Sequence, residues 1–400
     1  MKPHEYRTRR EKLLSSCEAS VIVLAAHREM QRVADAAYEF TQESNFYYLT
    51  GISKPDWRVI MTSEETILVR PDVSETYLAF NGGMTGERAL AISGANRTVS
   101  REQASELLLE IARSFDDVYT LDSALHSEYE TFVHNPAPMD LRNELSKVFK
   151  QVRDCRPQLA RLRAVKSEAE LSLMQKAIDE TIRVFKDVAQ NIAAYQYEYE
   201  LEAEFTYHFR RSGMDGHAYT PIVGGGANGC TLHYVANSSR LYEGGFVVID
   251  IGASFSGYAA DITRTYAIGE VSERHKDVHL AVQRAQKEII ELIGPGVSVR
   301  EYLNRADDIM RRELTRLGLM KKSGDDASFR RYFPHAISHG LGLDVHDSLG
   351  SPDVFEPGMV LTVEPGIYIP EEEIGVRIED DILVTNTGCR NLSESLSTGF

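Results

Sequence analysis

Residues 246–266, FVVIDIGASFSGYAADITRTY, decide how the second half of this 400-residue chain folds. The stretch holds two apolar runs rich in β-branched residues, and such runs are typical of strands. Each run carries one carboxylate, Asp250 in the first and Asp261 in the second. Acidic side chains are disfavoured inside strands, so both positions need a partner that compensates the charge. A metal ion or a nearby arginine, such as Arg264, would serve.

The same pattern returns further along the chain. Two long segments with helical periodicity precede a second pair of apolar strands, which carry Glu364 and Glu379. VIDIG at 248–252 parallels TVEPG at 362–366. The helical segments are residues 273–293 and 299–318, and the strands are MVLTVEPGIYI at 359–369 and GVRIEDDILVT at 375–385. We predict a duplicated helix-helix-strand-strand unit whose pseudo-twofold axis brings the four carboxylates together.

The helix that begins the first copy of this unit has a clear start signal. Ser167 and Glu170 form a capping box, after which apolar residues recur every three or four positions as far as Ile192. A second helical stretch covers residues 198–211. The basic segment 154–166 separates this pattern from the preceding part of the chain. We therefore predict a C-terminal domain that covers residues 166–400.

Residues 1–165 have a different organisation. Short apolar runs alternate with helical stretches, as is typical of an α/β layer. The segments are VIVLAA at 21–26, WRVIM at 57–61, ETILVR at 65–70 and SELLLEIARSF at 105–115. We predict a smaller α/β N-terminal domain here, so the chain as a whole belongs to the α/β (α+β) class with two domains, in keeping with its length.

A histidine cluster lies, in the sequence, between the first pair of predicted strands and the second pair. PHAISHGLGLDVHD, residues 334–347, contains His335, His339 and His346. The first two have the spacing of a helical zinc pair, but no glutamate follows His335 and two glycines soon after His339 oppose a continuing helix. One imidazole with four carboxylates is an oxygen-rich ligand set that suits manganese and, less selectively, cobalt or magnesium. Two metal ions sharing bridging carboxylates fit that number of ligands. Separate carboxylates paired with arginines such as Arg377 are the alternative.

A glycine-rich segment raises the question of a nucleotide site. GGGANG at 224–229 satisfies the G-x-G-x-x-G expression, but the following CTLHYVAN does not read as a helix, so no helix N-terminus is present for a pyrophosphate. We interpret the segment as a flexible turn that presents His233 to the site. The sequence has no G-x-S-x-G elbow and no cysteine in a nucleophile motif, so covalent catalysis has no candidate residue.

The composition argues against two classes of partner. The formal net charge of −16 repels phosphate backbones, so we expect no nucleic-acid partner. No segment approaches the roughly 18 apolar residues of a spanning helix, and the apolar run that follows the N-terminus is too short for a signal peptide. We expect a cytoplasmic protein without membrane contact, whose four widely spaced cysteines are free thiols.

Four segments together resemble the pita-bread metallopeptidases, in the branch of aminopeptidase P and prolidase. They are FVVIDIGASFSGYAADITRTY, ISHGLGLDVHD, SPDVFEPGMVLTVEPGIYI and VRIEDDILVT, and they span most of residues 221–385. YEFTQESNFYYLTGISKPD at 38–56 also resembles the N-terminal domain typical of aminopeptidase P. The resemblance implies a pita-bread fold for the C-terminal domain and an aminopeptidase P-type domain before it.

The same resemblance implies a role for each candidate ligand. Asp250 would hold one metal ion, and Asp261 and Glu379 would bridge two. His339 and Glu364 would complete the second metal ion's ligands. A hydroxide shared by the two ions would be the nucleophile, because metal binding lowers the pKa of water while the ions polarise the scissile carbonyl. Glu364 would also carry a proton to the leaving nitrogen.

Other residues enter through the resemblance as candidates around the metal ligands. His233 and His346 would stabilise the tetrahedral intermediate and seat the residue after the cleaved bond. Arg377 would orient His346 or the substrate. His335 and Tyr368 are candidate substrate-binding residues, although the sequence is equally compatible with a packed histidine and a core tyrosine whose hydroxyl is bonded.

The function implied is that of a proline-specific metallopeptidase. This hydrolase would be an Xaa-Pro aminopeptidase, a protease that releases the N-terminal residue of peptides whose second residue is proline. Its cofactors would be two divalent metal ions per chain, Mn²⁺ first, with Co²⁺ or Zn²⁺ as alternatives. An X–Pro bond lacks the amide N–H that general peptidases use, which is the physical reason for a dedicated enzyme.

Two other functions remain open at this level. A prolidase shares the metal core and cleaves only Xaa-Pro dipeptides, but the segment at 38–56 favours the aminopeptidase. A catalytically inactive peptide-binding pseudopeptidase would have lost ligands, whereas all five ligand positions are filled here. The family resemblance also implies a homo-oligomer, either a dimer or a tetramer.

Overall fold

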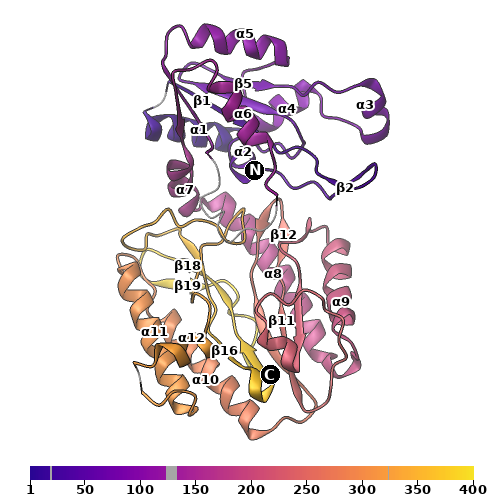
Figure 1. The fold of residues 1–400 in the computed structure, drawn as a ribbon, viewed down its shortest axis with the longest axis vertical. Coiled ribbons are helices and arrows are strands. Elements are labelled where there is room, and N and C mark those ends of the chain that lie inside the picture. Colours follow the sequence, from indigo (N-terminus) through magenta and orange to yellow (C-terminus); the bar gives the residue numbers. More distant parts are fainter. Residues whose placement is uncertain (19, 123–132, 323) are drawn as a thin grey trace. The chain divides into compact units, whose positions relative to one another are not determined.

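The computed structural model describes residues 1–18, 20–122, 133–322 and 324–400. The chain forms two compact units, Met1–Leu162 and Arg163–Phe400 (Figure 1). The boundary predicted from the sequence, after residue 165, lies three residues C-terminal to the boundary of the structure, after Leu162. Val165 forms a bridge with Met359, and the amide of Lys166 donates to the carbonyl of Gly358, so both residues are bound to the second unit.

A mixed six-stranded sheet forms the centre of the first unit, in the order β6-β5-β4-β1-β7-β8. The central strand β1 is buried along its whole length, pairs antiparallel with β4 and lies parallel to β7. The strands are β1 (Val21–Ala25), β4 (Arg58–Thr62), β5 (Thr66–Val69), β6 (Arg97–Val99), β7 (Asp117–Thr120) and β8 (Gln151–Asp154), and β2 (Gln31–Val33) with β3 (Ala36–Ala37) forms a separate hairpin. The predicted α/β layer is confirmed.

The first unit also contains helices, which are interspersed with these strands along the chain. They are α1 (Pro3–Cys17), α2 (Ser44–Thr50), α3 (Glu75–Asn81), α4 (Gly86–Ser93), α5 (Arg101–Ile111), α6 (Ala137–Leu145) and α7 (Arg156–Ala164), the last of which crosses the unit boundary. Ser100 caps α5 and, with Gln103, forms a capping box, which is why the helix begins four residues before the stretch predicted from residue 105.

The second unit contains the predicted repeat of two helices followed by strands. Its first half consists of α8 (Glu168–Gln190), η1 (Ile192–Ala194), α9 (Glu198–Arg211), β9 (Gly216–His217), β10 (Ile222–Gly225), η2 (Gly226–Cys230), β11 (Gly245–Asp250), β12 (Ala253–Phe255), β13 (Tyr258–Ala259) and β14 (Thr263–Ile268). Its second half consists of α10 (Glu273–Ile290), α11 (Val299–Arg316), α12 (Asp326–Tyr332), β15 (Val360–Val363), β16 (Gly366–Ile369), η3 (Pro370–Glu372), β17 (Ile374–Arg377), β18 (Asp380–Val384) and β19 (Cys389–Asn391).

The strands of the two halves pair in the same way. β11 pairs antiparallel with β14, and β15 pairs antiparallel with β18. A smaller antiparallel hairpin joins the two strands of each pair: β12 with β13 in the first half and β16 with β17 in the second. Helices α8 and α9 lie beside the strands of the first half, and α10 and α12 lie beside those of the second, with α11 packed against α10 (Figure 1). The predicted helix-helix-strand-strand duplication is confirmed.

Local signals explain where the long helices begin. α8 starts at the predicted capping box, in which the Ser167 hydroxyl accepts from the Glu170 amide while the Glu170 carboxylate accepts from the Ser167 amide. One face of α8 is buried, including Met174, Ile178 and Phe185. α12 was not predicted from the sequence, because a helix of only seven residues, capped by Asp325, has too little periodicity to recognise.

The glycine-rich segment at 224–229 differs from the flexible turn predicted for it. It continues β10 as far as Gly225 and then forms the 3₁₀-helix η2. A Cβ on Gly375 would overlap the carbonyl oxygen of Gly229, so close packing of η2 against β17 explains why small residues are needed there.

Two composition-based expectations can be compared with the structure. All four cysteines are free thiols, as predicted. Among the described residues, no helix has both the length and the apolar character that crossing a membrane requires.

Candidate active site

The four predicted carboxylates lie at the ends of paired strands. Asp250 is the last residue of β11, and Glu364 directly follows β15. Asp261 lies two residues before β14, and Glu379 directly precedes β18. The two halves meet at this point, because the Glu379 amide donates to the Thr263 carbonyl at 3.0 Å. The duplicated topology therefore brings together four side chains that are more than 100 residues apart at the extremes.

His339 lies against this carboxylate cluster. Its Nε2 atom is 3.4 Å from Oδ2 of Asp261, 3.5 Å from Oε1 of Glu364 and 3.9 Å from Oε1 of Glu379. Its Nδ1 atom is 3.0 Å from the carbonyl of Gly340, to which it donates in the tautomer that leaves Nε2 unprotonated. The imidazole is therefore oriented with Nε2 toward the carboxylates, as a metal ligand would be.

These side chains line one cavity of about 320 Å³ in the second unit. The sequence-predicted residues that line it are Asp250, Asp261, His339, Glu364, Glu379, His233, His335, His346 and Arg377. Its other lining residues are Tyr219, Thr220, Ile222, Leu232, Val235 and Val345. Nine of the ten predicted site residues thus reach one cavity, and Tyr368 lies behind its wall, in contact with two of them.

The carboxylates raise one another's pKa values. Burial first, and then the charges of Asp261, Glu364 and Asp250, raise the pKa of Glu379 well above its ordinary value. Burial and Asp261 also raise the pKa of Glu364 to about 7, although the charge of His339 opposes the shift. Burial would lower the pKa of His339, but Asp261 and Glu364 together raise it to about 9. The cluster is thus strongly attractive to cations.

The donor set fits divalent metal ions. Asp261, His339 and Glu379 offer ligand atoms that all lie within 4.8 Å of one another. Asp250 is 8% exposed and Glu379 is 2% exposed, so their charges are poorly solvated and their repulsion is not screened by water. Carboxylate oxygens with one imidazole are ligands that manganese, cobalt and zinc accept.

Arg377 connects three residues at the inner wall of the cavity. Its Nη2 donates to Oδ2 of Asp250 at 2.6 Å, and its Nη1 donates to the Tyr368 hydroxyl at 2.9 Å. The Tyr368 hydroxyl can in turn donate to Nε2 of His335, at 2.8 Å, since an arginine offers no acceptor. Arg377 thus bonds directly to Asp250, and the role that the family resemblance implies for it, orienting His346 or the substrate, stays a prediction.

His346 and His233 are more exposed than the candidate metal ligands. The rings of His346 and His339 form an edge-to-face contact with centroids 4.3 Å apart. His233 lies between η2 and the start of β11, in a loop that also brings Leu232 and Val235 to the cavity. Both histidines can thus reach a bound molecule in the cavity that the five candidate ligands also line.

Known proteins share this architecture. The family model "Metallopeptidase family M24" matches residues 172–386, and the model "Aminopeptidase P, N-terminal domain" matches residues 6–119. The chain belongs to metallopeptidase family M24. The pita-bread fold predicted for the C-terminal domain of this M24 protein, and the aminopeptidase P-type domain before it, are confirmed.

Relatives of this M24 protein match over nearly their full length. The Xaa-Pro aminopeptidase of Haemophilus influenzae is 34% identical, with 98% of this chain and 94% of the relative covered. The structure of aminopeptidase P from Escherichia coli in a low pH form has a TM-score of 0.89 at 29% identity, covering 100% of this chain and 96% of that one. A zinc-substituted Escherichia coli aminopeptidase P in complex with product has a TM-score of 0.88 at 28% identity, with the same coverage. The chain is therefore a metal-dependent hydrolase of the aminopeptidase type.

Two residues of this M24 site were missed in the sequence. The hydroxyl of Tyr219 donates to Oδ1 of Asp250 at 2.6 Å, and the hydroxyl of Thr263 donates to Oε2 of Glu379 at 2.6 Å. Each side chain fixes one oxygen of a candidate ligand, and the other oxygen of Asp250 accepts from Arg377. Only their neighbourhood in three dimensions identifies them, although the place of Thr263 two residues after Asp261 is a weak signal.

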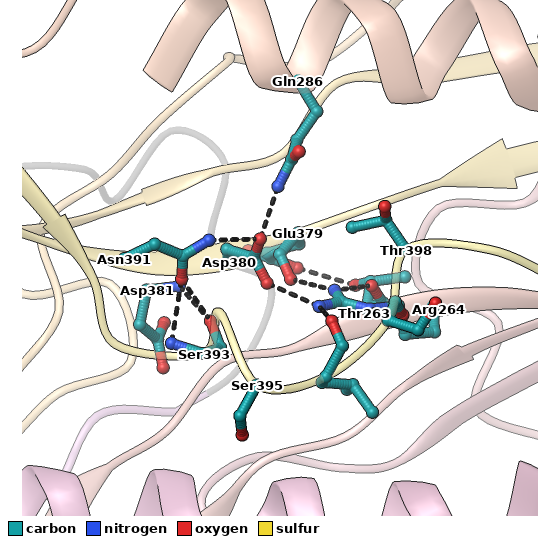
Figure 2. A network of polar contacts seen from close by, with 12 residues as sticks. Thr263, Arg264, Gln286, Glu379, Asp380, Asp381, Asn391, Ser393, Ser395 and Thr398 are labelled. Atoms are coloured by element: carbon teal, nitrogen blue, oxygen red, sulfur yellow. Dashed lines mark hydrogen bonds and ion pairs between the residues drawn. The ribbon is translucent and has the colours of Figure 1, made fainter. Parts of the chain in front are cut away.

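A polar network supports the strand end that carries Glu379 (Figure 2). Arg264 donates to Oδ1 of Asp380 at 2.6 Å and to the backbone carbonyl of Glu379 at 2.7 Å. Further members of the network are Gln286, Asn391, Leu396 and Ser397. In this M24 protein the C-terminal segment thus helps to hold the backbone of a candidate metal ligand.

Proposed function

We propose that this protein is an Xaa-Pro aminopeptidase that releases the N-terminal residue from peptides with proline in second position. The proposal rests on one observation above all: five side chains able to bind metal converge on a cavity in a chain that matches Xaa-Pro aminopeptidases over nearly its full length. The proposed ligands of two divalent ions are Asp250, Asp261, His339, Glu364 and Glu379. We propose Mn²⁺ as the physiological metal, because oxygen ligands predominate.

Divalent ions bound here would polarise the scissile carbonyl and lower the pKa of a water molecule toward neutrality. The chain's own residues then supply position and proton transfer. Tyr219 and Arg377 hold the two oxygens of Asp250, and Thr263 holds one oxygen of Glu379. These contacts keep the carboxylates in place before substrate arrives, which is the condition for electrostatic stabilisation of a transition state.

Glu364 is suited to move the proton. Its Oε1 is 3.5 Å from Nε2 of His339 and its Oε2 is 3.5 Å from Nδ1 of His335, so the carboxylate lies between two imidazoles that line the cavity. We assign to it the transfer of a proton from water to the leaving proline nitrogen. That nitrogen has no hydrogen in the substrate and leaves as an amine only after it has been protonated.

His233 and His346 are assigned to the substrate. Both line the cavity with exposed rings, and an imidazole N–H can donate to the carbonyl oxygen on which negative charge develops. Apolar side chains lie near them, and a proline ring offers a matching apolar surface. These lining residues are Ile222, Leu232, Val235 and Val345.

The proposal is tested with two substrates. Protein reloaded with Mn²⁺ is incubated with an Xaa-Pro-Xaa tripeptide and, separately, with an Xaa-Pro dipeptide, and the released N-terminal amino acid is quantified with and without chelator. Release from the tripeptide that is lost on chelation supports an aminopeptidase. Cleavage of the dipeptide alone would identify a prolidase, and no release despite bound metal would favour a peptide-binding role. Parallel reloading with Co²⁺ and Zn²⁺ tests the choice of manganese.

A variant checks the role assigned to His346. His346→Ala should lower kcat about 10²–10³-fold, as loss of one oxyanion donor does, while the metal content measured by mass spectrometry stays that of the wild type. Unchanged activity would contradict the assignment.

A cytoplasmic homo-oligomer completes the proposal. Four free thiols, two of them buried, are compatible with a reducing compartment. Fractionation of source cells tests the location, and light scattering on the purified protein tests whether it is a dimer or a tetramer.

A further inference from the structure

Glu198 is a buried carboxylate outside the ligand cluster. It is the first residue of α9 and is 0% exposed. Its Oε1 accepts from the amide of Gly225 and from Nδ2 of Asn228, both at 2.9 Å. Its Oε2 accepts from the hydroxyl of Tyr234 at 2.9 Å and from the amide of Ser239 at 2.7 Å. Both oxygens therefore have two donors each.

All four donors come from one segment, residues 225–239, which we call the His233 loop. This loop brings His233, Leu232 and Val235 to the cavity. Within the described part of the chain, the imidazole of His233 makes no hydrogen bond with another residue. Its position is therefore set by the backbone of the loop and not by side-chain contacts of its own.

The charge of Glu198 strengthens the attachment of the His233 loop to α9. Burying an ionised carboxylate is costly unless it is compensated, and among the described residues no lysine or arginine forms an ion pair with Glu198. The four hydrogen bonds are the compensation, and bonds to a charged acceptor are stronger than neutral ones. Opening of the His233 loop would leave the carboxylate buried without its donors, so the closed position is favoured.

We infer that Glu198 is a positioning residue of the enzyme, which holds His233 over the candidate metal ligands through the His233 loop. This inference rests on the proposed function for the role of His233. Glu198 itself touches neither the cavity nor the ligands; Tyr234, the neighbour of His233 in sequence, transmits its effect most directly.

The test is a double-mutant cycle on tripeptide hydrolysis. Glu198→Gln keeps the shape of the side chain but turns one acceptor oxygen into a donor, which faces two of the four donors and cannot bond with them. We expect kcat to fall about tenfold or more, with little change in KM and with the wild-type metal content. In a His233→Ala background the same substitution should change kcat by less than about twofold, because the residue through which it acts is gone.

Two variants keep the result interpretable. Tyr234→Phe removes a single bond to Oε2 and serves if Glu198→Gln does not fold; it should show a smaller loss with the same lack of effect in the His233→Ala background. Glu313→Gln is the matched control, since Glu313 is also 0% exposed and its carboxylate also accepts several bonds. Its partners are arginines of α10 and α11, which lie far from the His233 loop in the sequence. It should leave kcat unchanged.

Hydrogen exchange gives a readout that does not depend on activity. The amides of Gly225 and Ser239 donate to Glu198 and should exchange faster in Glu198→Gln but not in Glu313→Gln. Equal fold-losses of kcat in the wild-type and His233→Ala backgrounds, or unchanged exchange at these amides, would overturn the inference. If the wild type itself releases nothing from the tripeptide, the proposed function fails, and exchange still decides whether Glu198 holds the loop.

Discussion

Replacing Arg264 should destabilise the second unit strongly. Arg264 is 1% exposed, and its guanidinium makes five hydrogen bonds. Figure 2 shows the network around it. One bond goes to the carboxylate of Asp380, whose side chain is 2% exposed. The other acceptors are the backbone carbonyls of Thr263, Glu379, Leu396 and Ser397. Arg264→Met fills much of the same volume but leaves a buried carboxylate without its cation and four carbonyls without this donor.

Two routes give a similar magnitude. Breaking a buried ion pair by removal of one partner costs about 3–5 kcal/mol. Five lost hydrogen bonds at about 1 kcal/mol each give about 5 kcal/mol, part of which the apolar methionine offsets. We therefore expect the free energy of unfolding of the second unit to fall by about 4 kcal/mol. For a unit of this size that corresponds to a Tm lower by about 8–16 °C.

The two units allow an internal control in the assay. The chain has one tryptophan, Trp57, which lies buried in the first unit, so its fluorescence in urea follows that unit, while far-UV circular dichroism follows both. Arg264→Met should move the dichroism transition and leave the fluorescence transition in place. Measurements in chelator and in saturating Mn²⁺ separate the effect of the ion pair from that of bound metal.

A surface pair provides the matched substitution. Lys276 and Glu273 form an ion pair in which the glutamate side chain is 85% exposed, and Lys276→Met should change stability by no more than about 0.5 kcal/mol. If Arg264→Met costs less than about 1 kcal/mol, or no more than Lys276→Met, the reasoning from burial is refuted.

Three other perturbations have defined outcomes. Gly252→Ala places a Cβ into the carbonyl oxygen of Ala260, between the two strands that present Asp250 and Asp261; we expect loss of bound metal by mass spectrometry, and retention of wild-type content would contradict it. Ser167→Ala removes the cap of α8 and should cost about 1 kcal/mol in urea unfolding, whereas Ser167→Thr should cost clearly less; equal losses would refute the capping argument. Burial, with a smaller contribution from Arg264, lowers the pKa of His279 to about 4, and the Thr265 backbone opposes the shift. The unfolded chain then binds more protons between pH 6.5 and 4, so stability falls as the pH drops through that range. His279→Phe should flatten that part of the stability profile, and an unchanged slope would exclude His279 as its cause.

The ligand set was readable in the sequence because its residues contradict their surroundings. Asp250 and Glu379 stand at the ends of apolar strands, where propensity disfavours acidic side chains. The duplicated helix-helix-strand-strand unit, with its pseudo-twofold axis, then predicted that these ends would meet. The comparisons confirm the family and the fold, while the individual roles of the ligands remain predictions that the proposed experiments test.

Other expectations depended on contacts that no periodicity encodes. Arg377 was expected to orient His346 or the substrate, and the structure shows its hydrogen bonds with Asp250, Thr263 and Tyr368. The glycines at 224–229 suggested flexibility, yet they allow η2 to pack closely against β17.

The sequence by itself determined the repeated order of helices and strands, the start of α8, and the carboxylates and histidines that the strand ends carry. These features follow from local rules: a period of 3.6 or 2, a capping box, and the cost of a charge in an apolar run. Only the tertiary structure decided which neutral or distant side chains support them: Tyr219 and Thr263 on the ligands, Glu198 behind the His233 loop and Arg264 behind Glu379. Their roles depend on which donor lies within 3 Å of which buried acceptor, and that is settled by close packing between segments far apart in the chain.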